Sequence, residues 1–260
     1  MKKITISFIV ESKKLFLSKV PLITMLAFLL VPFIGSFFMY ILKNPDLARK
    51  LGFISAKAQI MGTADWPSYL SLLSQAVSIG GLIVFGFVTS WIFGREHSDR
   101  TIKDLLALPI SRHIIVLSKF LVAFLWSIFL SIFIFIIGIF AGHIVNIPGW
   151  SFDVLLNGFS VYIICTILTI LLSTPVAFFA SYGRGYLSPF SFMIFTIVIA
   201  QIVAAIGYGH LFPWSIPAII SGITGDLNIQ LEFISVLIVL LTSLFGLIGT
   251  LFWWRFADHK

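Results

Sequence analysis

Hydrophobic residues fill six long stretches of this 260-residue chain, and polar residues gather in the segments between them. The stretches are residues 20–42, 69–93, 114–142, 154–180, 187–208 and 231–254. Each is long enough for an α-helix that crosses the hydrocarbon core of a bilayer, which takes about 20 residues. Pro32 and Pro175 lie inside two of them and predict local kinks. We therefore predict an all-α integral membrane protein with six transmembrane helices, in one domain that spans residues 1–260.

Composition and charge agree with this pattern and give it a direction. Only 10% of the residues are charged, whereas soluble domains carry about 25%. Thirteen of the 17 Lys and Arg residues fall in the two termini and in the loops that share their side, and four fall on the other side. Because basic residues gather on the cytoplasmic side, both termini are expected in the cytoplasm. The net charge of +7 thus reflects topology and contact with membrane lipid, and no nucleic acid partner is expected.

The loop between the second and third spans is the most informative connection. It reads GREHSDRTIKDLLALPISRH and is dense in charge of both signs. Thr101 and Asp104 resemble a capping box, and Pro109 would end a helix that begins there, so we predict a short helix within residues 98–109. Its apolar contacts come from Ile102, Leu105, Leu106 and Leu108. Such a helix could transmit a push from a soluble partner, or it could be a solvated connector.

Three further segments are predicted to lie along the membrane surfaces. Residues 1–19 mix lysines with apolar residues and predict an interfacial helix, although Glu11 falls on the same face as Phe8 and Leu15. Residues 44–61 form a clearer amphipathic pattern on the outer side. Residues 209–230 are too apolar for an exposed loop and too short to span, which favours a re-entrant or interfacial outer hairpin. Its turn carries Pro213, Trp214 and Pro217.

Polar residues inside two spans form stripes at helical spacing. The second span carries Ser71, Ser74, Gln75 and Ser78, and the fifth carries Gln201, Ala205 and Tyr208. A polar stripe within a membrane must face protein or water. These residues could line a translocation path or a subunit interface, and ordinary helix packing explains them equally well.

Several motifs of catalysis do not occur in the sequence. It has no GxxxxGK[ST] phosphate-binding loop, no HExxH, no GxSxG and no Cys/His cluster with metal spacing. We therefore expect no enzymatic activity and no cofactor or metal bound by this chain itself. Acidic and basic residues are missing from the middle of the spans, and Lys119 and Glu232 lie near span ends. This weakens the alternative of an ion-coupled secondary transporter, which usually places ionisable groups near the midplane.

Residues 93–120 resemble the same region of ABC-2 type permeases. The shared features are a charged pair (Arg95, Glu96), a threonine that opens a short helix (Thr101), a leucine pair, a Pro-x-Ser-Arg element (109–112) and Lys119. Many members have glycine before the threonine, where this chain has Arg100. Length, span number and the proline-rich outer hairpin are also similar, and the likeness is greatest to small bacterial permeases of the bacitracin, lantibiotic and peptide-toxin export type.

The resemblance implies an exporter permease in the bacterial plasma membrane. Two permease chains, identical or related, would pair with two separate ATP-binding subunits that hold ATP and Mg. Residues 95, 96, 101, 102, 105, 106 and 108 would belong to the coupling element, the polar stripes would line the path, and the hairpin with Pro213, Trp214 and Pro217 would form the outer gate. The substrate could be an amphipathic peptide, an antibiotic or a lipid-like molecule. A channel or secondary transporter independent of ATP, or a non-transporting immunity or sensing subunit, stays open as an alternative.

Overall fold

The computed structural model describes residues 2–44, 63–107, 109–222 and 233–256, and within this part all regular structure is helical. Six helical stretches in it are long and apolar enough to cross a membrane: Val20–Lys43, Trp66–Ser98, Arg112–Ile144, Phe152–Tyr182, Leu187–Ala205 and Phe233–Phe256. The prediction of an all-helical protein with six membrane helices is confirmed. The predicted outer helix at 44–61 lies almost wholly outside the described residues.

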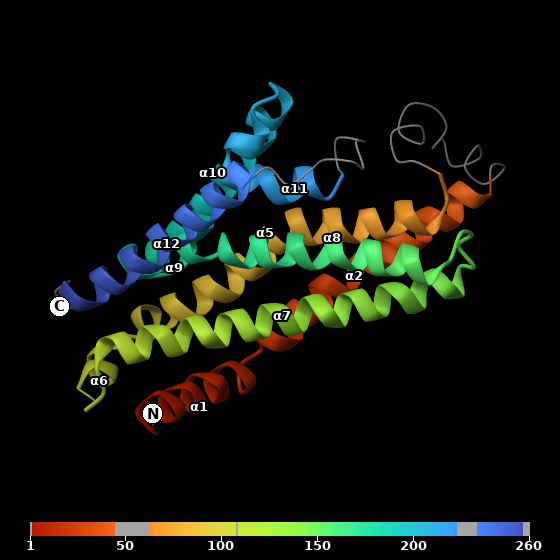
Figure 1. The fold of residues 1–260 in the computed structure, drawn as a ribbon. Helices are drawn as coiled ribbons and strands as arrows, with labels where there is room; N and C mark the ends of the chain where they lie inside the picture. The colour runs from red at the N-terminus through yellow and green to blue at the C-terminus, as the bar shows by residue number, and fades with distance from the viewer. Residues whose placement is uncertain (1, 45–62, 108, 223–232, 257–260) are drawn as a thin grey trace.

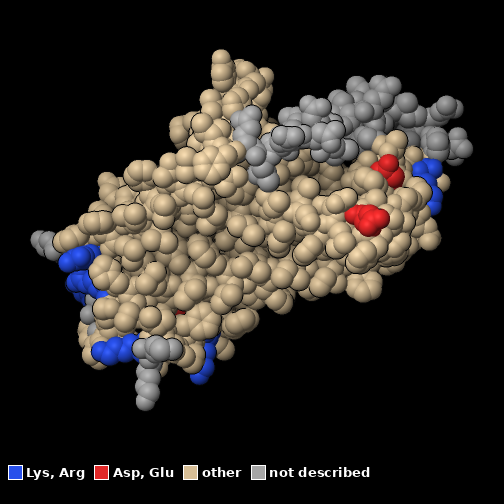
Figure 2. All heavy atoms as spheres, in the orientation of Figure 1, with Lys and Arg blue, Asp and Glu red and all other residues tan. Residues whose placement is uncertain are grey.

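The helices form an elongated bundle in which both chain ends lie at one end (Figure 1). We call this the terminal end, and it also carries the short helix α6 (Ile102–Leu106). Helix α1 (Lys2–Phe16) lies beside α7 (Arg112–Ile144) and leads through residues 17–19 into α2 (Val20–Lys43). On the face in Figure 2, charged side chains lie at the two ends of the bundle, and the described surface between them is mainly uncharged.

Helix α5 (Trp66–Ser98) is the centre of the bundle, because it packs against α2, α7, α8 (Phe152–Leu171), α9 (Thr174–Tyr182) and α10 (Leu187–Ala205). Its large side chains Tyr69, Phe85 and Phe93 are fully buried. It begins with a well-formed cap, in which the Asp65 carboxylate accepts a hydrogen bond from the Ser68 amide at 2.9 Å.

The two prolines inside predicted spans behave differently. The fourth span breaks into α8 and α9 just before Pro175, because proline has no N–H to donate and its ring clashes with the carbonyl four residues earlier. Helix α2 runs on through Pro32. Helix α12 (Phe233–Phe256) packs closely on the broken span, and a Cβ atom at Gly246 would lie 2.4 Å from the Pro175 nitrogen. The break and the glycine together allow the two backbones to touch.

The predicted hairpin is partly described. Two 3-10 turns, η1 (Gly209–Leu211) and η2 (Pro213–Ser215), lead into the short helix α11 (Ile216–Ile220), and residues 223–230 lie outside the described residues. The Pro217 carbonyl accepts a hydrogen bond from Ser78 of α5 at 2.9 Å. Ser78 lies twelve residues after the start of α5, about 18 Å along a helix that rises 1.5 Å per residue. The hairpin therefore reaches well down the side of α5.

Candidate functional site

The predicted coupling element at the terminal end is shorter than expected. Among the described residues after the end of α5, the helix of this element is Ile102–Leu106. Thr101 takes the N-cap position without a side-chain capping hydrogen bond, so the predicted capping box is wrong. The Thr101 amide instead donates to the Glu96 carbonyl at 2.9 Å, which fastens the start of α6 to the end of α5. Arg100 makes the turn with a φ of 58°, in the left-handed region that glycine adopts most readily.

The side chains of α6 divide into an inner and an outer face. Ile102 is buried and Leu105 packs partly buried against the core, whereas Lys103, Asp104 and Ala107 are exposed. The side chains of Leu106 and Leu108 lie outside the described part. The exposed side that the structure describes thus consists of Lys103 and Asp104 of α6 and of Ala107, its C-cap. Helix α6 projects from the terminal end of the bundle (Figure 1).

The predicted pair Arg95 and Glu96 separates into two environments. Arg95 is near the surface, where its Nε atom lies 3.2 Å from Asp99 Oδ2 and its guanidinium lies over the Trp91 ring. Glu96 is 2% exposed and turns inward, so its carboxylate is not available to a protein that docks on this surface. Its partners are side chains of α1 and α7.

Glu96 belongs to a closed ring of four charges, two acidic and two basic, that we call the ion ring: Glu11 and Lys14 of α1, Glu96 of α5 and Lys119 of α7. Lys119 Nζ lies 2.9 Å from Glu11 and 2.8 Å from Glu96. Lys14 Nζ lies 2.6 Å from Glu11 and 3.0 Å from Glu96. Each base therefore contacts both acids, and the ring as a whole is neutral.

Sequence reasoning missed the roles of Glu11 and Lys119, although both left a signal. Glu11 interrupts the apolar face of the first helix, and Lys119 lies a full turn inside the third span. Each residue looks like an imperfection when read alone. An acid and a base that both fall on buried faces are expected to be partners, because an unpaired buried charge is very costly.

The polar stripe of α5 faces the hairpin and α8 at the opposite end of the bundle. Ser71 donates to the Ser221 carbonyl at 2.8 Å, and Gln75 donates to Ser71 at 3.1 Å. Ser78 is buried and bonded to Pro217, while Ser74 is buried and donates to the Leu70 carbonyl. In this chain the stripe thus holds the hairpin in place, and only its first part borders open space.

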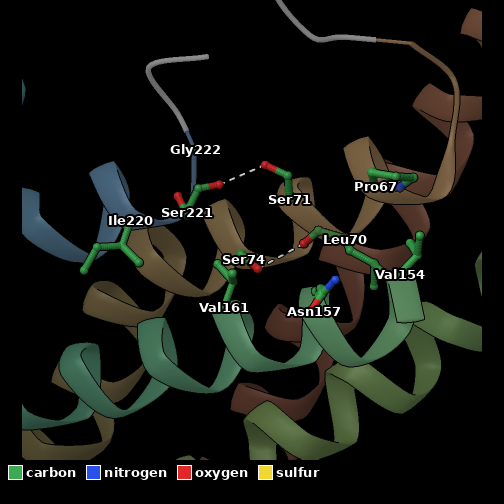
Figure 3. Close-up of a pocket in the computed structure, with 11 residues that line it drawn as sticks. Pro67, Leu70, Ser71, Ser74, Val154, Asn157, Val161, Ile220, Ser221 and Gly222 are labelled. Atoms are coloured by element: carbon green, nitrogen blue, oxygen red, sulfur yellow. Dashed lines mark hydrogen bonds between the residues drawn. The ribbon is translucent and has the colours of Figure 1, made fainter. Parts of the chain in front are cut away.

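That open space is a pocket of about 270 Å³ between α5, α8 and the end of α11 (Figure 3). Ser71, Asn157 and Ser221 give it polar groups among mainly apolar walls, and no lining residue carries a charge. The remaining lining residues are Pro67, Leu70, Ser74, Val154, Gly158, Val161, Ile220 and Gly222. Its volume is near the lower limit for small-molecule sites, about 300 Å³.

The predicted residues of the fifth span lie elsewhere. Gln201 and Ala205 of α10 and the nearby Tyr208 are exposed on the surface of the bundle. Gln201 also borders a cavity of about 50 Å³ between α5, α10 and the hairpin, which includes Trp214. Within one chain, therefore, the stripe of α5 and Gln201 border two separate spaces, and residues of α11 line both of them.

The hairpin residues predicted as an outer gate are packed rather than free. Trp214 contacts Phe192 of α10 edge to face, with ring centres 5.5 Å apart. Pro217 is buried, and its carbonyl accepts from Ser78 and from the Cys165 thiol. Pro213 begins the second turn. This arrangement connects the hairpin to α5, α8 and α10 together.

Comparison with known proteins identifies the family. Residues 7–202, which include most of α1, the whole ion ring and both pocket helices, match the model of the ABC-2 family transporter protein. The chain belongs to the ABC-2 transporter family. It is also 29% identical over 178 residues to the bacitracin transport permease protein BCRB of Bacillus licheniformis. The aligned region covers 68% of this chain and 85% of that protein. The resemblance seen at residues 93–120 is thereby confirmed for the family, and as an ABC-2 protein with six membrane helices the chain is a multi-pass membrane permease.

Proposed function

We propose that this ABC-2 permease is the membrane part of an ATP-driven exporter whose ATP and Mg are bound by two copies of a separate subunit. The observation that carries the proposal is the family match over residues 7–202, which includes α6. The similarity to a bacitracin transport permease favours an amphipathic peptide antibiotic as the substrate class. A pocket with apolar walls and a few uncharged polar groups suits such a molecule.

An orientation with both termini in the cytoplasm would bring α6 within reach of an ATP-binding subunit. Both termini and α6 share one end of the bundle, and thirteen of the 17 basic residues belong to the segments on this side. The charge bias therefore favours a cytoplasmic terminal end in the plasma membrane. The exposed face of α6, with Lys103, Asp104 and Ala107, is the part that would dock on the ATP-binding subunit.

A second permease chain would complete the translocation path. Gln201 exposes its amide on a helix of the membrane region, and a polar group at that position must meet protein or water rather than lipid. We infer that the face of α10 with Gln201 and Tyr208 lies against a second permease or the path between the two. The hairpin, which reaches down α5 on the outer side, would be the gate.

Transport into inside-out membrane vesicles tests this function. The chain is produced together with its ATP-binding partner, and ATP-dependent uptake of fluorescent bacitracin is measured. Ala107→Trp places a bulky ring on the exposed face of α6 and should abolish uptake at unchanged membrane content. His113→Trp is the control, because it adds the same ring to another exposed position at the same end.

Two outcomes would support the other functions. Uptake by the chain alone, driven by an ion gradient and indifferent to ATP, would make it a secondary transporter. Protection of cells against bacitracin without any uptake into vesicles would make it an immunity or sensing subunit.

A further inference from the structure

The ion ring connects three helices that are distant in the sequence. Glu11 and Lys119 are 108 positions apart, and Lys14 and Glu96 are 82 apart. Lys119 is 0% exposed, and Glu11 and Glu96 are 6% and 2% exposed. The ring is therefore an interior contact between α1, α5 and α7, not a set of surface ion pairs.

The Lys119 ammonium is fully satisfied. Besides the two carboxylates it donates to the Ile92 carbonyl at 2.8 Å, which gives its three protons three acceptor groups. Buried ion pairs of this kind contribute little net stability relative to apolar residues of the same shape. What they provide is geometry, because each charge has a low-energy position only opposite its partners. The ring thus specifies one arrangement of α1 against α5 and α7.

The ring lies directly beside the coupling element. Glu96 is a member of the ring through its carboxylate, and its backbone carbonyl accepts a hydrogen bond from the amide of Thr101, the N-cap of α6. One residue thus connects the ring to the start of α6. At the other flank, Lys3 Nζ of α1 lies 3.5 Å from the carbonyl of Pro109, after α6. Helix α1 therefore contacts the chain on both sides of α6: the ring joins it to Glu96, which precedes α6, and Lys3 contacts Pro109, which follows α6.

The geometry points to a latch: the ion ring makes α1 move with α6 and the adjoining ends of α5 and α7, so that a displacement of α6 also reaches α2. Glu11, Lys14 and Lys119 are positioning residues in this role. They act through their contacts with Glu96 and with each other. The inference rests on the proposed function for the source of the displacement, but the latch itself is a property of this chain alone.

A double substitution opens the latch without leaving an unpaired charge. Glu11→Gln with Lys14→Gln removes both α1 members and keeps Glu96 and Lys119 as a neutral pair. The exchange of Glu11→Lys with Lys14→Glu keeps the amino-acid composition. It places a base opposite Lys119 and an acid opposite Glu96, so that like charges meet at both contacts of α1 with the other helices. Lys13→Gln is the matched control, because Lys13 is exposed on the same helix and outside the ring.

Distances between spin labels on α1 and α7 measure the latch in the full chain. Labels replace Ile4 and Leu125, which are 41% and 52% exposed, in a Cys165→Ala background in lipid nanodiscs. We expect one narrow distance distribution in the parent and in Lys13→Gln, a broader one in the neutral double variant and the broadest in the exchanged variant. Equally narrow distributions in all four, each with unchanged helix content, would overturn the latch.

The complex with the ATP-binding subunit tests transmission. The neutral double variant should still hydrolyse ATP while its bacitracin uptake per ATP falls, whereas Lys13→Gln should keep the parent ratio. An unchanged ratio in the double variant would overturn transmission through α1. If no ATP-binding subunit associates with the parent chain, the proposed function fails instead, and the label distances still decide whether the latch exists.

Discussion

Removal of Lys119 and Glu11, singly and together, gives the sharpest prediction for stability. Lys119→Met leaves two buried carboxylates facing Lys14, which is 27% exposed. Breaking a buried pair by removing one partner costs about 3–5 kcal/mol, because the other charge stays buried. Glu11→Gln alone leaves the opposite imbalance, in which the two basic side chains Lys14 and Lys119 face Glu96 as the remaining acid of the ring. The double variant keeps Lys14 and Glu96 as a neutral pair, so its loss of stability should be smaller than the sum of the two single losses by about 1–3 kcal/mol.

The single cysteine of the chain provides the assay. Cys165 is fully buried between α8 and the hairpin, so a dye that fluoresces on reaction with thiols reports unfolding in detergent. In a protein of this size 1 kcal/mol shifts the melting temperature by about 2–4 °C. We expect the double variant to melt several degrees above the value that the two single shifts predict together. Strict additivity would refute the reasoning, since it would mean that the four charges do not act as one ring.

Three further predictions use the same melting assay. Gly246→Ala should destabilise the folded protein by about 1–3 kcal/mol, because the new Cβ atom would meet the Pro175 backbone. Gly185→Ala is the control, since open space surrounds that position, and it should have little effect. Equal melting temperatures of the two variants would contradict the close contact of α12 and α9. Asp65→Ala should cost about 1 kcal/mol through loss of the α5 cap. Burial raises the pKa of the Asp65 carboxyl, but hydrogen bonds from Thr63 and Ser68 outweigh it and hold the pKa below its usual value. The difference in stability between the parent and Asp65→Ala should therefore vanish as the pH falls through the lowered pKa. A difference that persists at low pH would count against the cap. Arg100→Gly should not lower stability, because a left-handed residue other than glycine costs about 1–2 kcal/mol, and a clear loss would show that the Arg100 side chain contributes more than the turn.

Hydropathy was sufficient for the membrane helices because a span is a local property of the sequence. Twenty apolar residues need no partner to be recognised, and the break at Pro175 follows from the chemistry of one residue. These features require no knowledge of which helices are neighbours.

The ion ring and the pocket depend on contacts between distant parts of the chain. Glu11 could be recognised as misplaced on an apolar face, but its partner lies on another helix, and only the packing of α1 on α7 brings Lys119 to it. The spacing of the four polar residues predicted a stripe on one face of α5, but periodicity could not place the hairpin whose Pro217 carbonyl accepts a hydrogen bond from Ser78. The inward turn of Glu96 has the same origin.

The composition of the complex purified through this chain tests the central claim most directly. The chain is isolated from its native membrane in a mild detergent, and native mass spectrometry determines which proteins accompany it and in what numbers. The proposal predicts two permease chains with two ATP-binding subunits, and loss of the latter from Ala107→Trp. Recovery of the unaltered chain in stable form, active in transport and without any ATP-binding subunit, would contradict it.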